Sequence, residues 1–263
     1  MNELEFFFEN NKTRLMNKWQ HYFDIYDRYF HQFKDKPVTI LEIGCFHGGS
    51  LQMWKKYFGD KAVIWGIDID PRCKSLEEEN INILIGSQED KTFLKSAIEQ
   101  IGEIDILIDD GGHTQNQQKV SFEILFDHIN PNGIYFCEDT HTSYWNSYGG
   151  GHNRRGTFTE YSKKLIDQLN AFHSEQNSLK TDSFTKTANS IHFHDSIIVI
   201  EKKERVRPSS KITGTPSFSQ SIQKKTILEK FHYHFLINLN KILQKLNLPG
   251  VFVNKLLDLS SKS

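Results

Sequence analysis

Short, β-prone apolar runs alternate with helical patterns between residues 38 and 139, and this alternation constrains the fold more than any other feature. Strands are expected at VTILEIG (38–44), AVIWGID (62–68), INILIG (81–86), IDILIDD (104–110) and GIYFCED (133–139). Helices are expected between them, over 49–58, 71–79, 90–101 and 115–129. Runs that are apolar almost throughout fit strands covered on both faces. The pattern therefore predicts an α/β fold with a mostly parallel sheet.

The pattern changes around residue 140. NPNG at 130–133 predicts a turn, and the aromatic, glycine-rich stretch that follows residue 139 predicts a loop over a site. A helix near 157–173 and two strands within 190–203, joined around His194 and Asp195, are expected next. The predicted organisation is a helical N-terminal segment (1–37), a main domain (38–204), a linker (205–224) and a basic amphipathic helical extension (225–263).

Length and composition suit a soluble chain with one large domain and an appendage: 263 residues, 37% of them hydrophobic. No apolar run approaches the roughly 18 residues that span a bilayer, and the start of the chain lacks the order of a signal peptide. The three cysteines cannot all pair with one another, and none has the spacing of a metal site. We therefore expect reduced thiols and a cytoplasmic protein.

Charge is distributed unevenly along the chain. From Lys202 onward, twelve Lys and Arg residues face three Asp and Glu residues, a net charge of +9, whereas the preceding residues carry 20 against 30. The helix expected at 225–247 could pack on the acidic body, pair with a second copy of the chain, or contact an anionic membrane. Nucleic-acid binding is disfavoured, because arginines and aromatic residues do not interleave in a recognised motif.

A glycine-rich turn, LEIGCFHGGS, follows the first predicted strand. Glu42 lies near the end of the strand, Gly44 comes next, and Gly48 and Ser50 open the following helix. Glycines at such a turn let a ligand approach the backbone closely, and the helix N-terminus offers free N–H groups. Asp68, at the end of the second strand, can accept both hydroxyls of a ribose. Together these residues predict a nucleoside-type cofactor across the edge of the sheet.

The spacing of the glycines indicates which cofactor this is. A dinucleotide fingerprint reads G-x-G-x-x-G, whereas this turn reads E-x-G-x-x-x-G-G. That form resembles the S-adenosylmethionine loop of Rossmann-like methyltransferases. By analogy with those enzymes, the backbone near Gly44 of this chain would contact the methionine part of the cofactor, and Asp68 would contact the ribose. Ser87 and Gln88, which follow the third strand, would face the adenine.

Acidic residues end the fourth and fifth predicted strands. Asp109 and Asp110 end the fourth strand, and Glu138 and Asp139 end the fifth. Adjacent parallel strands deliver their carboxyl ends to the same edge, so these carboxylates should gather beside the cofactor. They would repel one another unless a cation joins them. Oxygen ligands without a suitable cysteine indicate Mg²⁺ or a similar divalent ion rather than zinc.

His113 follows this acidic pair on the turn into the next helix. Methyl transfer to an alcohol needs a group that removes the hydroxyl proton, and a neutral imidazole suits that task. His113 is the predicted general base; a structural hydrogen bond at the turn and metal ligation are the alternatives, and His141 is a second candidate base. Asp109 is expected beside the cofactor or as a cap of the next helix.

Four stretches carry a family resemblance: LEIGCFHGGSLQMWKKYF, IWGIDIDP, IDDGGHTQNQQKVSFEILFDHINPNGIYFCEDTHTSYW and IHFHDSIIVIEK. Over residues 38–202 the chain resembles the metal-dependent sugar O-methyltransferases of macrolide biosynthesis, of the mycinamicin and macrocin type. The D-D-G-x-H block followed by E-D is the most specific part. The longer macrolide enzymes have an N-terminal domain that helps to build the acceptor site, whereas 37 residues precede the first strand here.

The resemblance implies a Rossmann-like class I methyltransferase sheet of seven strands, mostly parallel, with the last two strands in an antiparallel hairpin. It implies S-adenosylmethionine- and Mg²⁺-dependent methylation of a hydroxyl on a sugar or glycosylated small molecule. It makes His113 the general base, and TSYW matches the acceptor region, so Tyr144 and Trp145 would pack on a sugar face. The implied metal ligands are Asp110, Glu138 and Asp139.

Two other functions fit such a sheet. One is an oxidoreductase or hydroxylase, although no iron facial triad with clear spacing is present in the sequence. The other is a nucleoside-binding module that has lost catalysis and works through its tail.

Overall fold

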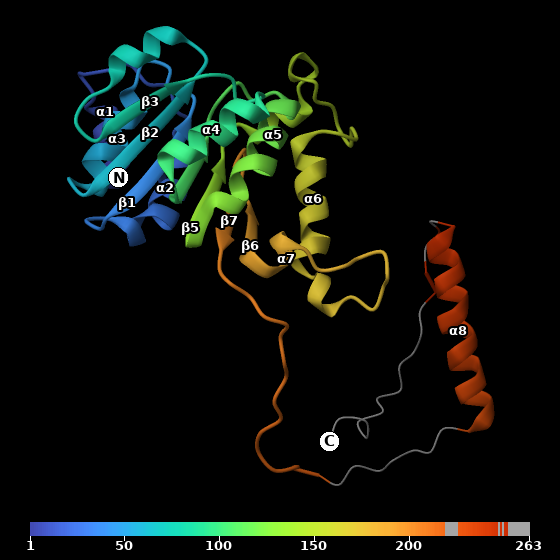
Figure 1. Ribbon diagram of the computed structural model, residues 1–263. Coiled ribbons are helices and arrows are strands. Elements are labelled where there is room, and N and C mark those ends of the chain that lie inside the picture. Colours follow the sequence, from blue (N-terminus) through green and yellow to red (C-terminus); the bar gives the residue numbers. More distant parts are fainter. Residues whose placement is uncertain (219–225, 247, 249, 252–263) are drawn as a thin grey trace. The chain divides into compact units, whose positions relative to one another are not determined.

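A seven-stranded sheet with the strand order β3-β2-β1-β4-β5-β7-β6 forms the centre of the fold. The strands are β1 Val38–Ile43, β2 Ala62–Asp68, β3 Ile81–Ile85, β4 Ile104–Asp109, β5 Ile129–Cys137, β6 Ala188–Phe193 and β7 Ile198–Lys202. The first five pair in parallel, and β7 runs antiparallel to both β5 and β6. The structure is a computed structural model that describes residues 1–218, 226–246, 248 and 250–251 (Figure 1). The predicted mostly parallel sheet with a terminal antiparallel hairpin is confirmed.

Helices cover both faces of the sheet within the first of two compact units, Met1–Pro208 and Ser209–Ser263 (Figure 1). Side chains alternate across a strand, so Ile40 and Leu41 of β1 enter two separate hydrophobic cores. The first core contains residues of α1 Glu3–Glu9, α2 Tyr22–Phe30 and α3 Gly49–Phe58. The second core contains residues of α4 Lys91–Ile101, α5 Gln115–Leu125 and α6 Phe158–Leu169.

The order in which the chain adds strands to the sheet reverses between β1 and β4, although the two strands are parallel. From β1 the chain continues outward through β2 and β3, and it then returns to place β4 on the other side of β1. Ile43 and Asp109, the last residues of β1 and β4, are paired neighbours. In parallel α/β sheets a crevice opens at the carboxyl ends of two such strands. The glycine turn and Asp110 follow directly on these two strands, so both border this crevice.

Capping residues set the ends of the helices that flank the crevice. The Asp90 carboxylate accepts hydrogen bonds from the first N–H groups of α4, and Gly102, at φ +79°, ends that helix. Thr114 and Gln117 form a reciprocal capping box that starts α5. Because α5 starts there, His113 lies immediately outside the helix, at the edge of the sheet.

Several details differ from the sequence expectations, among them the helix expected at 115–129, which ends at Leu125. The helix expected at 71–79 is a shorter 3₁₀ helix, and the one expected at 157–173 stops at Leu169. The turn expected at 130–133 lies inside β5, where the pairing with β4 shifts register. The loop after residue 139 contains two 3₁₀ turns. The short helices are η1 His31–Phe33, η2 Pro71–Leu76, η3 Phe126–His128, η4 Thr140–Tyr144, η5 Asn146–Tyr148, η6 Ala171–His173 and α7 Ser183–Thr187.

The second unit contains α8 Ile227–Lys245, which begins with a capping box between Thr226 and Glu229. The helix was expected over 225–247, whose two end residues lie outside the described residues, as do 252–263. Residues 205–218 of the expected linker form no helix or strand. None of the helices in the described part of the chain is long and apolar enough to cross a membrane. Packing, pairing and membrane contact of α8 stay predictions.

Candidate active site

Two cavities open at the carboxyl edge of the sheet, and they meet at a shared set of polar residues. The glycine-loop cavity, about 720 Å³ in volume, is lined by residues that include Gly44, Asp68, Ser87 and Gln88. The aromatic cavity, about 730 Å³, is lined by residues that include Trp19, Tyr22, His141, Trp145 and Tyr148. Both cavities are lined by Asn17, Asp110, His113 and Asp139. Molecules bound in the two cavities would therefore face each other across these side chains.

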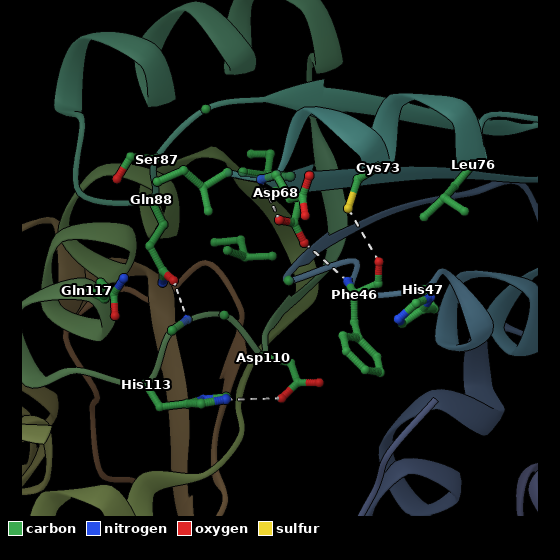
Figure 2. A pocket seen from close by; sticks show the side chains of 18 of the residues that line it. Phe46, His47, Asp68, Cys73, Leu76, Ser87, Gln88, Asp110, His113 and Gln117 are labelled. Atoms are coloured by element: carbon green, nitrogen blue, oxygen red, sulfur yellow. Dashed lines mark hydrogen bonds and ion pairs between the residues drawn. The ribbon is translucent and has the colours of Figure 1, made fainter. Parts of the chain in front are cut away.

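The glycine loop is shaped around Gly44 and Asp68. Gly44 has φ +94°, and a Cβ atom there would lie 2.1 Å from the carbonyl oxygen of Asp110, so no larger residue fits. One oxygen of the Asp68 carboxylate accepts the N–H groups of Cys45 and Phe46, at 2.8 and 3.1 Å. These bonds fix the Asp68 side chain at the wall of the cavity (Figure 2).

Gln88 lines the same cavity (Figure 2), and its side-chain amide makes two hydrogen bonds. Its Oε1 accepts the N–H of Gly112 at 2.7 Å, and its Nε2 donates to Asp109 Oδ1 at 3.1 Å. Asp109 is only 1% exposed, does not line the cavity, and also accepts a hydrogen bond from the Ser121 hydroxyl. Burial raises the pKa of Asp109. Asp109 therefore supports Gln88 from behind rather than facing a ligand.

Three other predicted cofactor residues also lie behind the cavity. Glu42 is fully buried, and it accepts hydrogen bonds from the Ser50 hydroxyl at 2.7 Å and from Trp54 Nε1 at 3.1 Å. Gly48 adopts φ +77° as the N-terminal cap of α3. None of Glu42, Gly48 and Ser50 lines the glycine-loop cavity. They join the end of β1 to the start of α3 and so shape the loop.

Asp110, His113 and Asp139 form the meeting point of the two cavities. His113 Nε2 lies 3.9 Å from Asp110 Oδ1 and 3.5 Å from Asp139 Oδ2. One ligand atom from each of these three residues lies within 4.8 Å of the other two, and they are the one such group found among the described residues. The Nδ1 atom of His113 is buried and has no hydrogen-bond partner. The donor atoms of two carboxylates and an imidazole suit a divalent cation.

Lys18, from the segment between α1 and α2, lies in the site and was missed by the sequence analysis. Its Nζ lies 2.6 Å from Asp110 Oδ2, 3.1 and 3.0 Å from the two oxygens of Glu138, and 3.6 Å from Glu42 Oε1. Burial alone would lower the pKa of Lys18, but the neighbouring carboxylates raise it well above its usual value. Burial, and then the charge of Asp110, raise the pKa of Glu138. Both Glu138 oxygens thus contact Lys18.

The aromatic cavity has one wall from the N-terminal segment and one from η4 and η5. Trp19 meets the His141 ring edge-to-face at 5.6 Å between centroids, and His141 lies 4.5 Å from the Trp145 ring. Trp145 lines the cavity, whereas Tyr144 is 55% exposed and lines neither cavity. Tyr22, which is fully buried, donates a hydrogen bond of 2.6 Å to Asp139. No sequence signal identified Trp19 or Tyr22.

Comparison with known proteins agrees with this geometry. No family model matches the chain. It is 33% identical, over 71% of its length, to the 8-demethyl-8-α-L-rhamnosyl tetracenomycin-C 2'-O-methyltransferase of Streptomyces olivaceus, of which it covers 52%. It is 33% identical, over 67% of its length, to the demethylmacrocin O-methyltransferase of Streptomyces fradiae, of which it covers 47%. The chain thus spans about half the length of the curated relatives that it matches.

A solved structure shares the fold. The MycE methyltransferase of the mycinamycin biosynthetic pathway, in complex with Mg, SAH and mycinamycin VI, superposes with a TM-score of 0.70 at 29% identity. The match covers 77% of this chain and 54% of MycE. The fold is therefore that of a class I methyltransferase. The resemblance to the macrolide sugar O-methyltransferases, which the motifs predicted, is confirmed by these relatives.

Proposed function

We propose that this chain is an S-adenosylmethionine-dependent, Mg²⁺-dependent O-methyltransferase that methylates a hydroxyl of a sugar or glycosylated small molecule. The observation that carries the proposal is that the glycine-loop cavity and the aromatic cavity meet at Asp110, His113 and Asp139. A donor and an acceptor can therefore lie on either side of a base and a set of metal-binding oxygens. The complexes of MycE with Mg and SAH support the same assignment.

The glycine-loop cavity would hold the methyl donor. Gly44 lines this cavity, and the Asp68 carboxylate is fixed where it can accept ribose hydroxyls. Ser87 and Gln88 supply polar side chains for the adenine, and Gln88 is held by Asp109. When bound, S-adenosylmethionine supplies an electrophilic sulfonium methyl group.

Asp110 and Asp139 would hold the metal ion, with Glu138 as the third ligand if it exchanges its contact with Lys18. The fit follows from charge, because the carboxylates of Glu42, Asp110 and Glu138 surround a single ammonium group. That leaves an excess of negative charge which a divalent cation would neutralise. When bound, Mg²⁺ lowers the pKa of a coordinated hydroxyl group.

His113 would act as the general base. Its side chain lines both cavities, so it can reach a hydroxyl group placed beside the donor. Nε2 would accept the hydroxyl proton while the oxygen forms its bond to the methyl carbon and the carbon–sulfur bond breaks. His141 is less suited to this role, because its Nδ1 is engaged with the Ser196 hydroxyl and it lies outside the glycine-loop cavity.

The aromatic cavity would bind an uncharged sugar. Trp19 and Trp145 offer apolar rings on two walls, and aromatic rings pack well on the C–H faces of sugars. Among the described residues that line the cavity there is no arginine, and Lys18 is paired with carboxylates. A phosphate-bearing acceptor would thus find no free cationic side chain there, and its phosphate would compete with the reacting hydroxyl group for the proposed metal ion. A neutral glycoside fits the cavity better than a nucleotide-linked sugar.

Two measurements test the proposal. Calorimetry should show binding of S-adenosylhomocysteine and no binding of NAD⁺, and the reverse result would favour the oxidoreductase. A screen of neutral glycosides with labelled S-adenosylmethionine should show methyl transfer that EDTA abolishes and added Mg²⁺ restores. Transfer that is insensitive to EDTA would refute the metal dependence. Binding of the donor product without transfer to any glycoside would favour a non-catalytic module.

A further inference from the structure

We propose that Lys18 is an internal cation that competes with the metal ion for Asp110 and Glu138, so that the N-terminal segment sets the metal affinity of the site. The inference rests on the proposed magnesium site and goes beyond it, because it assigns a positioning role to a residue outside the methyltransferase motifs. Lys18 contacts the carboxylates that would ligate the ion, so it would act through them.

The charge of Lys18 is balanced by three carboxylates, beside two aromatic rings. The side chain is 2% exposed, and its Nζ lies 5.8 and 6.0 Å from the ring centroids of Tyr26 and Trp54, both fully buried. All of its close oxygen partners are carboxylates of Glu42, Asp110 and Glu138. A buried ammonium group without these partners would be costly, so the contacts fix both the lysine and the acids.

The two acids differ in how far Lys18 engages them. Asp110 contacts Lys18 through Oδ2 and directs Oδ1 toward His113, so one oxygen stays on the side of the proposed metal site. Glu138 contacts Lys18 through both oxygens. An ion bound by Asp110 and Asp139 would therefore be repelled by the nearby ammonium, and Glu138 could join it only by leaving Lys18.

The segment that carries Lys18 is itself anchored. Asn11 Nδ2 donates to the Arg14 carbonyl oxygen at 2.8 Å, and the Arg14 guanidinium donates to the Leu76 carbonyl oxygen at 2.8 Å. The segment also packs so closely on α3 that a Cβ at Gly49 would lie 2.5 Å from the Arg14 carbonyl oxygen. Lys18 thus follows an anchored stretch of chain, and a metal ion has to displace a group that is held in place.

The test is calorimetric titration of MgCl₂ into the full chain and two variants. Lys18→Met keeps the length of the side chain and removes its charge, and we expect the Mg²⁺ dissociation constant to fall at least about tenfold. Lys202→Met is the matched control. Lys202 is also buried, at 6% exposed, but its Nζ donates to the carbonyl oxygens of Phe126 and Asp127. That variant should lose stability and keep the Mg²⁺ affinity of the unaltered chain.

A second pair of variants keeps the proposal testable if Lys18→Met does not fold. We compare Glu42→Gln with the double variant that combines Glu42→Gln and Lys18→Met. The double variant removes one negative and one positive charge together. Tighter Mg²⁺ binding in the double variant than in Glu42→Gln supports the proposal. Equal or weaker binding on removal of Lys18, in either pair, overturns it. If neither the unaltered chain nor any of these variants binds Mg²⁺, the proposed metal site fails instead, and the two failures are distinguished.

Discussion

The hydrogen bond of Tyr22 to Asp139 allows the effect of removing the Tyr22 hydroxyl on stability and on metal affinity to be predicted. Its hydroxyl donates to Asp139 Oδ1 at 2.6 Å and lies 2.8 Å from the Ser196 hydroxyl, and the ring is fully buried. Burial and the hydrogen bond to Asp139 raise the pKa of Tyr22, so the phenol stays protonated and keeps donating. Asp139 has left-handed backbone geometry, at φ +53°, just after β5. Tyr22 is thus one of the contacts that orient the Asp139 carboxylate.

Tyr22→Phe removes one oxygen atom and leaves the ring in place. A hydrogen bond to a charged group contributes about 1.5–3 kcal/mol, so we expect the free energy of unfolding to fall by about 2 kcal/mol. For a chain of this size that corresponds to a melting temperature lower by roughly 4–8 °C. A freed Asp139 carboxylate should also reduce metal affinity or methyl transfer, typically by about 10–100-fold for an outer partner of a metal ligand.

A matched variant separates stability from function. Tyr57 is also buried, and its hydroxyl donates to Asp27 Oδ1 at 2.7 Å, a contact of α2 and α3 away from both cavities. Tyr57→Phe should lower the unfolding free energy by a similar amount, measured by urea denaturation, with kcat unchanged. If Tyr22→Phe and Tyr57→Phe lose equal stability and keep equal activity and Mg²⁺ affinity, the proposed orienting role of Tyr22 is wrong.

Three further variants probe the base, the loop and the acceptor wall. His113→Ala should lower kcat by at least about 100-fold with S-adenosylhomocysteine affinity unchanged in calorimetry, and retained turnover would remove it as the base. Gly44→Ala should weaken the affinity for S-adenosylhomocysteine and lower the melting temperature more than Gly102→Ala, because a Cβ at Gly102 meets nothing within 4 Å. Equal effects of the two variants would contradict the close packing at Gly44. Trp145→Ala should raise the KM for the glycoside roughly tenfold, whereas Tyr144→Ala should leave it unchanged.

The sheet could be predicted from the sequence because its central strands are buried on both faces and leave long apolar runs. β2 and α3 have the bounds that the pattern predicted. The meeting of Asp110 and Asp139 also follows from the sequence, since β4 and β5 are parallel neighbours and Asp109 pairs with Cys137. Residues that follow two paired strand ends must lie close together, whatever the details of the loops.

The sequence did not show which acids face a ligand, because these strands are buried on both faces. In a strand covered on both faces the apolar pattern does not say which side chain points toward the crevice, and both Glu42 and Asp109 turned out to be enclosed. Lys18 could not be foreseen for a different reason. It lies in a segment without periodicity, 92 residues before Asp110 and 120 before Glu138. Contacts so distant in the chain are not encoded in any local pattern.

Lys18 also changes the argument that led from clustered carboxylates to a metal ion. Repulsion among Asp110, Glu138 and Asp139 requires a compensating cation, and a lysine can meet that need as well as an ion can. The count decides between them: Lys18 contributes one positive charge, whereas these three acids and Glu42 can contribute four negative charges. Burial raises the pKa values of Glu42 and Glu138, which favours their neutral forms and would reduce the difference. Asp110 and Asp139, which line both cavities, are the acids best placed for a divalent ion.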